Sequence, residues 1–285
     1  MASGVQRLCL GAYALCRRSG LMSSRLGQSL FVPAYFFYKR RWEAPWIGLV
    51  AQLAEPGSLA VDAGANIGFF ARELASAVGP SGRVLAFEPD AANCAVLQDV
   101  LRRGGHANAS VVMAALGEKD GTVQLHLNAD HPADHRVYAA AGHEAGPRVP
   151  LRSLDQVLAQ EGGGRPLSVV KIDVQGAELR VLRGMRQTLL RHPRARLLLE
   201  FDPAMLAESG ASAEELADFL RGLGFLAYRL GPGPAAEPLS WDSAPVCARQ
   251  AGSIDLLLTR QPWSSKAAAK STNTGMTGMR KRTTA

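Results

Sequence analysis

The middle of the chain alternates short apolar runs with longer segments of helical periodicity. Residues 59–64 and 83–89 have the length and composition of buried strands, and residues 67–78 and 91–103 have the spacing of amphipathic helices. The alternation continues with strands at 110–116, 168–174, 196–201, 225–230 and 253–260, and helices at 153–160, 177–192 and 212–224. This pattern is typical of βαβ units, which build a parallel sheet covered on both faces by helices. We therefore predict an α/β fold; residues 122–128 alternate like an exposed strand, and 129–152 show no clear period.

Three of the predicted strands end in an acidic residue. Asp62, Glu88 and Asp173 each follow a run of buried apolar residues. A carboxylate buried within a sheet is costly unless something compensates it, but at the carboxyl end of a strand it can reach a ligand instead. Open parallel sheets bind their ligands at this edge, where the strand order reverses. We therefore expect the three acids to line one site.

The turn after the first strand, DAGANIG, suits close contact with a ligand. Gly64 and Gly68 allow the backbone to approach a bound group, and the turn leads directly into a helix N-terminus. Glu88 follows Gly64 by 24 residues, where a carboxylate can accept hydrogen bonds from both hydroxyls of a ribose. Loop and carboxylate together predict a cofactor that contains a nucleoside.

The charge of the loop distinguishes between cofactors. A dinucleotide site requires GxGxxG around a pyrophosphate, and this loop lacks that spacing. Asp62 would repel a pyrophosphate but would attract an ammonium or a sulfonium. S-adenosylmethionine carries both cations and no phosphate, so it is the favoured cofactor. A nicotinamide-dependent oxidoreductase and a non-catalytic nucleoside-binding module are the alternatives.

Four separated motifs resemble the FkbM-type family of S-adenosylmethionine-dependent methyltransferases. They are VDAGANIGFF, RVLAFEPD, RSLDQVL and KIDVQGAELRVLRG, and the similarity covers about residues 55–205. The resemblance implies a Rossmann-like methyltransferase fold with a mostly parallel seven-stranded sheet, helices on both faces and an antiparallel last strand. It also implies O-methylation of a sugar or a secondary metabolite. The chain departs from the family motif at Gln175, where Glu is usual.

The resemblance also implies which residues hold the cofactor. The matching positions are Asp62, Gly64, Asn66, Gly68 and Glu88. The expected set further includes their neighbours Ala65 and Pro89, and Ala115 in the third strand.

Catalysis requires a group that aligns the acceptor and takes its proton. Asp173 lies at the strand end where the methyl group should emerge, although it could instead cap the next helix. Glu178 is expected either to contact the acceptor or to face solvent. His135 is a rival base, since a histidine titrates near neutral pH. The sequence leaves the choice between Asp173 and His135 open.

His135 belongs to a polar segment, NADHPADHRVY, at 128–138. Asp130, His131, Asp134 and His135 lie within six residues and could contact the acceptor or a metal. Their spacing is not diagnostic of a metal site, and long loops often serve as lids over active sites. We expect acceptor contact and assign no metal.

The basic charge of the chain is concentrated at its two ends. Residues 1–42 carry seven basic side chains and 260–285 carry six, with no acidic residue in either, whereas the centre holds all 25 acids. The net charge of +7 is therefore poor evidence for a nucleic-acid partner. We expect a basic, aromatic-containing helical segment at 1–54, a methyltransferase domain at 55–260 and a disordered basic tail at 261–285. The first 30 residues also resemble an organellar transit peptide in composition.

The remaining composition restricts the class of protein. No apolar run is long enough to cross a membrane. The four cysteines are scattered without a CxxC pair, which argues against a zinc site or a disulfide scaffold and favours a reducing compartment, most simply the cytoplasm. The expected partner is a small-molecule or glycan acceptor, and the oligomeric state is not predicted.

Overall fold

A computed structural model describes residues 24–264, except 130, 132, 162, 163 and 234, together with positions 11 and 15. The sequence predictions for most of residues 1–23 and for the tail from 265 onward lie outside these described residues. No described helix combines the length and the apolar character that crossing a bilayer requires.

The main sheet contains eight strands. In spatial order they are β10 (Ala236–Leu239), β9 (Leu226–Leu230), β11 (Ile254–Thr259), β8 (Arg196–Phe201), β7 (Leu167–Ile172), β1 (Leu59–Ala63), β2 (Arg83–Phe87) and β3 (Ala109–Val112). The five strands from β8 to β3 are parallel, and β11 runs antiparallel to both of its neighbours. The strand order reverses between β1 and β7, so the ligand edge predicted from the sequence lies at the carboxyl ends of these two strands.

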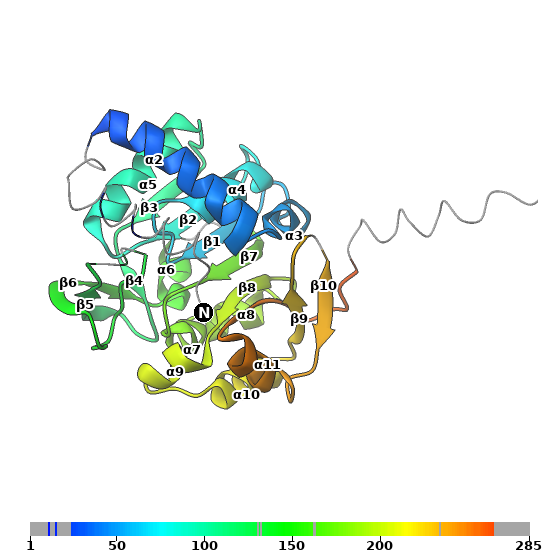
Figure 1. Cartoon of the computed structure of the whole chain (residues 1–285). Coiled ribbons are helices and arrows are strands. Elements are labelled where there is room, and N and C mark those ends of the chain that lie inside the picture. The colour runs from blue at the N-terminus through cyan, green and yellow to red at the C-terminus, as the bar shows by residue number, and fades with distance from the viewer. Residues whose placement is uncertain are drawn as a thin grey trace, which may run out of the picture.

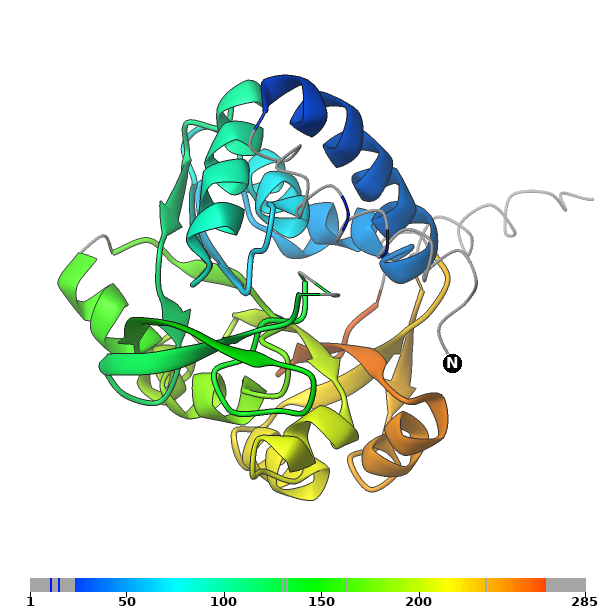
Figure 2. The same ribbon diagram turned by 60° about the vertical axis from the view of Figure 1, so that its left-hand side comes forward.

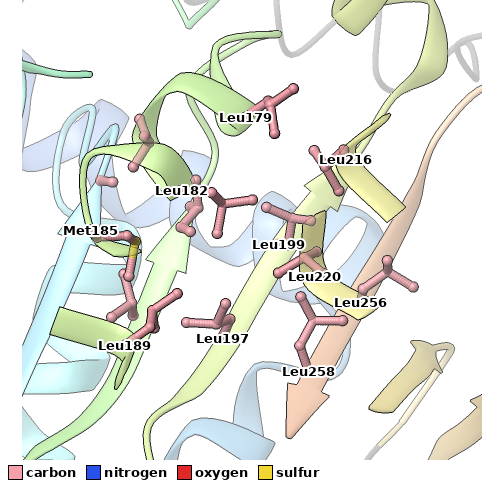
Figure 3. Packing of buried hydrophobic residues seen from close by; sticks show 14 of the residues in the cluster. Leu179, Leu182, Met185, Leu189, Leu197, Leu199, Leu216, Leu220, Leu256 and Leu258 are labelled. Carbon is pink, nitrogen blue, oxygen red and sulfur yellow. The ribbon is translucent and has the colours of Figure 1, made fainter. Parts of the chain in front are cut away.

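Helices cover both faces of this sheet (Figure 1). One face packs on α2 (Arg25–Tyr38), α3 (Val50–Leu53), α4 (Phe69–Val78) and α5 (Ala91–Arg103). The other face packs on α6 (Leu154–Glu161), α7 (Glu178–Arg183), α8 (Arg186–Arg191), α9 (Pro203–Glu208), α10 (Ala213–Gly222) and α11 (Ala244–Ala251). Figure 3 shows this second layer, in which leucines of α7, α8 and α10 meet those of β8 and β11. The predicted α/β fold is confirmed.

A second, three-stranded sheet lies beside the main one. It consists of β4 (Ala115–Leu116), β6 (Glu144–Arg152) and β5 (Gly121–Leu127), drawn in green in Figure 2. Strand β6 falls in the stretch that shows no clear period in the sequence. Only one of its residues, Val149, is buried. The sequence of β6 therefore lacks the alternation of apolar and polar residues by which a strand is predicted.

The segment before β1 packs closely on the domain. The ring of Phe36 on α2 meets Phe69 edge-on at 5.4 Å, and Trp46 stacks on Phe70 at 5.5 Å. A π-helical turn, η2 (Lys39–Glu43), and a 3-10 turn, η3 (Ile47–Leu49), connect α2 to α3. The domain boundary after residue 54 stays a prediction, because these aromatic contacts run across it.

Besides β6, other element assignments differ from the sequence prediction, and helices α9 and α11 were not predicted. The sheet gains an eighth strand at its edge, β10, whose residues include Pro238 and give a weak strand signal. The predicted strand 110–116 divides between β3 and β4, which belong to different sheets. The predicted helix 177–192 divides into α7 and α8 around Gly184 and Met185. The backbone of Gly117 lies where a side chain at 184 would be, so this position requires glycine.

Candidate active site

A cleft of about 970 Å³ opens at the carboxyl ends of the parallel strands. Six of the predicted cofactor-binding residues line it: Gly64, Ala65, Asn66, Glu88, Pro89 and Ala115. Asp173 and His135 line the same cleft. Asp62, Gly68 and Glu178 do not form part of its lining. The cleft therefore brings together most of the site predicted from separate motifs.

The turn from 64 to 68 is held in place by its backbone. The N–H groups of Gly64 and Ala65 both donate to the carbonyl of Phe87, at 3.0 and 2.9 Å, which ties the turn to the end of β2. Gly64 has φ of +78°, and a Cβ at this position would lie 1.9 Å from the carbonyl oxygen of Asp173. Only glycine lets β1 and β7 approach this closely at the point where the strand order reverses.

Gly68 has a different function from Gly64. It precedes the first residue of α4 with φ of +96°, and a Cβ there would lie 2.6 Å from Leu97 of α5. The absence of a side chain at Gly68 therefore permits the close approach of α4 to α5.

Glu88 is buried at the wall of the cleft. One carboxylate oxygen accepts a 2.8 Å hydrogen bond from the N–H of Asn66, and the other accepts bonds from the N–H of Asp90 and the amide of Asn93. Burial raises the pKa of Glu88 to about 7, although these donors oppose the shift. The oxygen bonded to Asn66 retains a lone pair, so Glu88 can still accept a hydrogen bond from a ligand.

Asp62 lies beneath the cleft and is fully buried. Neither carboxylate oxygen meets a hydrogen-bond donor with good geometry among the described residues. Burial raises its pKa to about 6, and the positive charge of Lys171 on the neighbouring strand opposes that rise. Asp62 is therefore a buried acid next to the reversal of strand order, and the charge of Lys171 compensates its burial only in part.

Asp173 is engaged on both carboxylate oxygens. Lys171 Nζ lies 2.6 Å from one, and the side-chain amide of Gln175 donates a 2.6 Å bond to the other. Burial would raise the pKa of Asp173, but the charges of Lys171 and Lys39 outweigh it and hold this pKa well below its ordinary value. Asp173 is therefore an ionised carboxylate at neutral pH.

The amide of Gln175 bridges two carboxylates. Besides Asp173, it lies 3.4 Å from Oε2 of Glu200, at the end of β8. A glutamate at 175, usual in the family motif, would place a third carboxylate here. The departure at this position thus replaces a negative charge with a donor between two acids.

Sequence reasoning missed two acids of the cleft, Glu200 and Asp255. Glu200 ends the strand RLLLEF in the same way that Asp173 ends its own, so a signal was present. Asp255 lies near the start of β11 and pairs in register with Glu200, because β11 runs antiparallel. Burial, together with the charge of Asp173, raises the pKa of both Glu200 and Asp255.

Glu178 holds the turn that carries Gln175. Its Oε1 accepts bonds from the N–H groups of Val174 and Gly176, each at 3.1 Å, and its side chain is buried. Burial raises its pKa to about 7. This placement favours a role in shaping the turn over direct contact with the acceptor.

The polar segment 128–138 contributes two histidines to the cleft, His131 and His135. The N–H of Asn128 donates to Nδ1 of His135 at 3.2 Å, so neutral His135 carries its proton on Nε2. Asp134 pairs instead with Arg136 at 2.7 Å. Asp130 lies outside the described residues, and no cluster of three metal-binding side chains occurs within the described part of the chain.

Residues from both ends of the domain close the far side of the cleft. Tyr35, Lys39, Glu43 and Trp46 line it from the N-terminal segment, opposite the ends of β7, β8 and β11. Lys39 Nζ lies 3.2 Å from Glu43 and 5.8 Å from the centre of the Tyr35 ring. The cleft thus has a loop-lined half over β1 and β2 and a second half lined by acids and aromatic rings.

Residues 62–227 match the model of the methyltransferase FkbM domain, and the chain belongs to this family. Among curated proteins, it is 31% identical over 210 residues to AMB antimetabolite synthetase AmbE of Pseudomonas aeruginosa, covering 60% of this chain and 10% of that protein. It is 26% identical over 148 residues to Methyltransferase 1 of Beauveria bassiana, covering 45% and 58%. The chain thus spans less than two thirds of either relative.

Solved structures of methyltransferases are similar to this chain at low identity. The FkbM methyltransferase of Methylobacillus flagellatus is 18% identical with a TM-score of 0.45, over 74% of this chain and 50% of that one. A SAM-dependent methyltransferase of Aquifex aeolicus is 12% identical with a TM-score of 0.42, over 77% and 90%.

Proposed function

We propose that this chain is an S-adenosylmethionine-dependent methyltransferase that methylates a hydroxyl group of a sugar or a secondary metabolite. The observation that carries the proposal is one cleft lined both by the loop with Glu88 and by the ionised Asp173. Family membership supports the reaction type, and the relation to an antimetabolite synthetase supports a small-molecule acceptor.

The residues of the loop half suit S-adenosylmethionine. Glu88 lines the cleft and keeps a lone pair on the oxygen bonded to Asn66, which can accept a hydrogen bond from a ribose hydroxyl. The turn 64–68 holds no basic residue, and the carboxyl group of Asp62 is buried behind it. A pyrophosphate would be repelled there, whereas an ammonium or sulfonium is attracted. This charge disfavours the nicotinamide-dependent alternative.

The bound cofactor would supply an activated methyl group, which leaves the protein to align the acceptor and remove its proton. Asp173 is suited to accept a hydrogen bond from the acceptor hydroxyl and to orient its oxygen toward the loop half. Such positioning contributes about 7–11 kcal/mol in favourable cases, and base assistance about 10²–10⁴-fold. Because the pKa of Asp173 is low, it would take the proton late, as the oxygen forms its bond to carbon.

His135 remains the rival base. Its neutral form presents an N–H at Nε2, because Nδ1 accepts from Asn128, so it would first donate to an acceptor rather than take a proton. This arrangement favours Asp173.

The dispersed cysteines favour a reducing compartment, and we propose the cytoplasm.

Calorimetry with S-adenosylhomocysteine and with NAD tests the proposed cofactor. We expect binding of the first and none of the second, and the reverse would overturn the proposal. A screen of hydroxylated small molecules and glycans with a labelled methyl donor then identifies the acceptor. Binding of S-adenosylhomocysteine without turnover on any acceptor class would favour the non-catalytic module.

A further inference from the structure

Helix α2 carries a second row of apolar side chains that turns away from the domain. Leu26, Leu30 and Phe37 are 70, 68 and 65% exposed, and their spacing places them on one face of the helix. The opposite face, with Tyr35 and Phe36, is buried in the core. Figures 1 and 2 both show α2 at the outside of the molecule.

Trp42, just beyond α2, extends this row. It is 48% exposed, and the ring of Phe37 meets it edge-on at 6.1 Å. We call Leu26, Leu30, Phe37 and Trp42 the outer face of α2. Four large apolar side chains gathered on α2 and the η2 turn are more than scattered surface residues would give, and such patches mark interaction sites.

Basic residues border the outer face. Lys39 pairs with Glu43 and Arg40 with Glu73, but Arg41 makes no ion pair within the described part of the chain and lies over the Trp42 ring at 5.5 Å. Residues 24–43, which contain α2 and η2, hold four basic side chains and one acidic side chain, Glu43. The border of the face is therefore positively charged.

We propose that the outer face of α2 docks on an anionic lipid surface. A helix with exposed leucines and aromatic rings, bordered by arginine, lies in the plane of the headgroups with its apolar side inserted. The basic border argues against a second copy of this chain, because pairing would bring two positive borders together.

Docking in this orientation has a consequence for the cleft. Trp42 belongs to the outer face and also lines the cleft from the N-terminal side. The mouth of the cleft would then lie next to the lipid headgroups, where an acceptor held at the membrane surface could reach it.

Co-sedimentation of the full chain with vesicles tests the proposal. One set contains equal parts of phosphatidylglycerol and phosphatidylcholine, and the other contains phosphatidylcholine alone. We expect binding to the anionic vesicles that weakens in high salt. The double variant Leu30→Ser, Phe37→Ser should bind about tenfold or more weakly, since two inserted apolar side chains are lost. Arg41→Gln should reduce the preference for anionic vesicles.

Matched substitutions of exposed apolar residues elsewhere control for general stickiness. Leu190→Ser on α8 and Val246→Ser on α11 remove side chains that are 49 and 48% exposed, and both should bind like the unaltered chain. Thermal unfolding by circular dichroism verifies that each variant is folded.

Two results would overturn the proposal. One is a dimer by light scattering that Leu30→Ser, Phe37→Ser dissociates, because the outer face would then pair two copies. The other is a folded monomer that does not sediment with either vesicle, or whose binding is lost equally in the Leu190 and Val246 variants.

Discussion

Trp46 Nε1 donates a 2.8 Å hydrogen bond to Oδ2 of Asp255, joining two residues that lie 209 positions apart. Both lie outside the segment 62–227 that matches the family domain, and both line the cleft. The contact fastens the N-terminal segment to the last strand of the sheet. The acid-lined half of the cleft is therefore completed by the two ends of the domain.

Trp46→Phe should destabilise the protein by about 1–3 kcal/mol at pH 8, because it leaves the buried Asp255 carboxylate without this donor. Burial raises the pKa of Asp255 to about 6, so at pH 5 the carboxyl is protonated and the loss of the donor should cost less. Denaturant unfolding at the two pH values measures the difference. Trp241→Phe is the control: its Nε1 donates to the neutral carbonyl of Phe225, so its effect should not depend on pH. Equal losses for Trp46→Phe at both pH values would contradict the assignment.

Glu88→Ala should weaken binding of S-adenosylhomocysteine by about 1.5–3 kcal/mol, the range for hydrogen bonds to a charged group. Calorimetry measures the affinity, and Glu237→Ala, which alters an exposed glutamate on β10, should have no effect. Unchanged affinity in a folded Glu88 variant would show that the ribose is held elsewhere.

Affinity for S-adenosylhomocysteine should rise as pH increases through about 7. Burial raises the pKa of Glu88 to about 7, and its ionised form is the stronger hydrogen-bond acceptor for a ribose hydroxyl. At one pH unit below this pKa, the dissociation constant should be about tenfold larger than at a pH well above the pKa. Glu88→Gln cannot titrate, so its profile should be flat across this range. A profile as steep as that of the unaltered chain would assign the titration to another group.

Gly64→Ala should unfold the turn or abolish cofactor binding. Its Cβ would overlap the backbone of Asp173, and a backbone clash cannot be relieved by rotating a side chain. Gly210→Ala is the matched control, since its φ of +86° is also left-handed but nothing lies within 4 Å of the added Cβ. The control should lose only about 1–2 kcal/mol, the cost of a side chain in the left-handed region. Similar melting temperatures for the two variants would mean that the strand ends are less closely packed than described.

Asp173→Asn should lower turnover by about 10²–10⁴-fold and weaken S-adenosylhomocysteine binding only modestly. Kinetics with an acceptor from the screen, beside calorimetry, separate the two effects. His135→Ala is the opposing test. If His135→Ala abolishes turnover while folded Asp173→Asn stays active, the proton goes to the histidine and Asp173 acts by holding Lys171.

The fold was predictable because its signals are local. Each central strand is a short apolar run and each helix has its own period, so the layers follow from segments read one at a time. Strand β6 was not predictable, because its residues are mostly exposed and do not alternate between apolar and polar side chains. The split of 110–116 also escaped prediction, because only pairing with distant strands decides which sheet Val112 and Ala115 join.

For the site, the sequence determined that Asp62, Glu88 and Asp173 would gather at one edge, because the carboxyl ends of parallel strands meet there. Tertiary structure decided what each one contacts: Asp62 lies buried behind the cleft, whereas Glu88 and Asp173 face it. Asp255 joins the same edge from the start of its strand because β11 is reversed, and strand direction depends on pairing across the sheet. The hydrogen bond between Trp46 and Asp255 depends on this strand direction. The two residues lie 209 positions apart, and only the folded sheet brings them together.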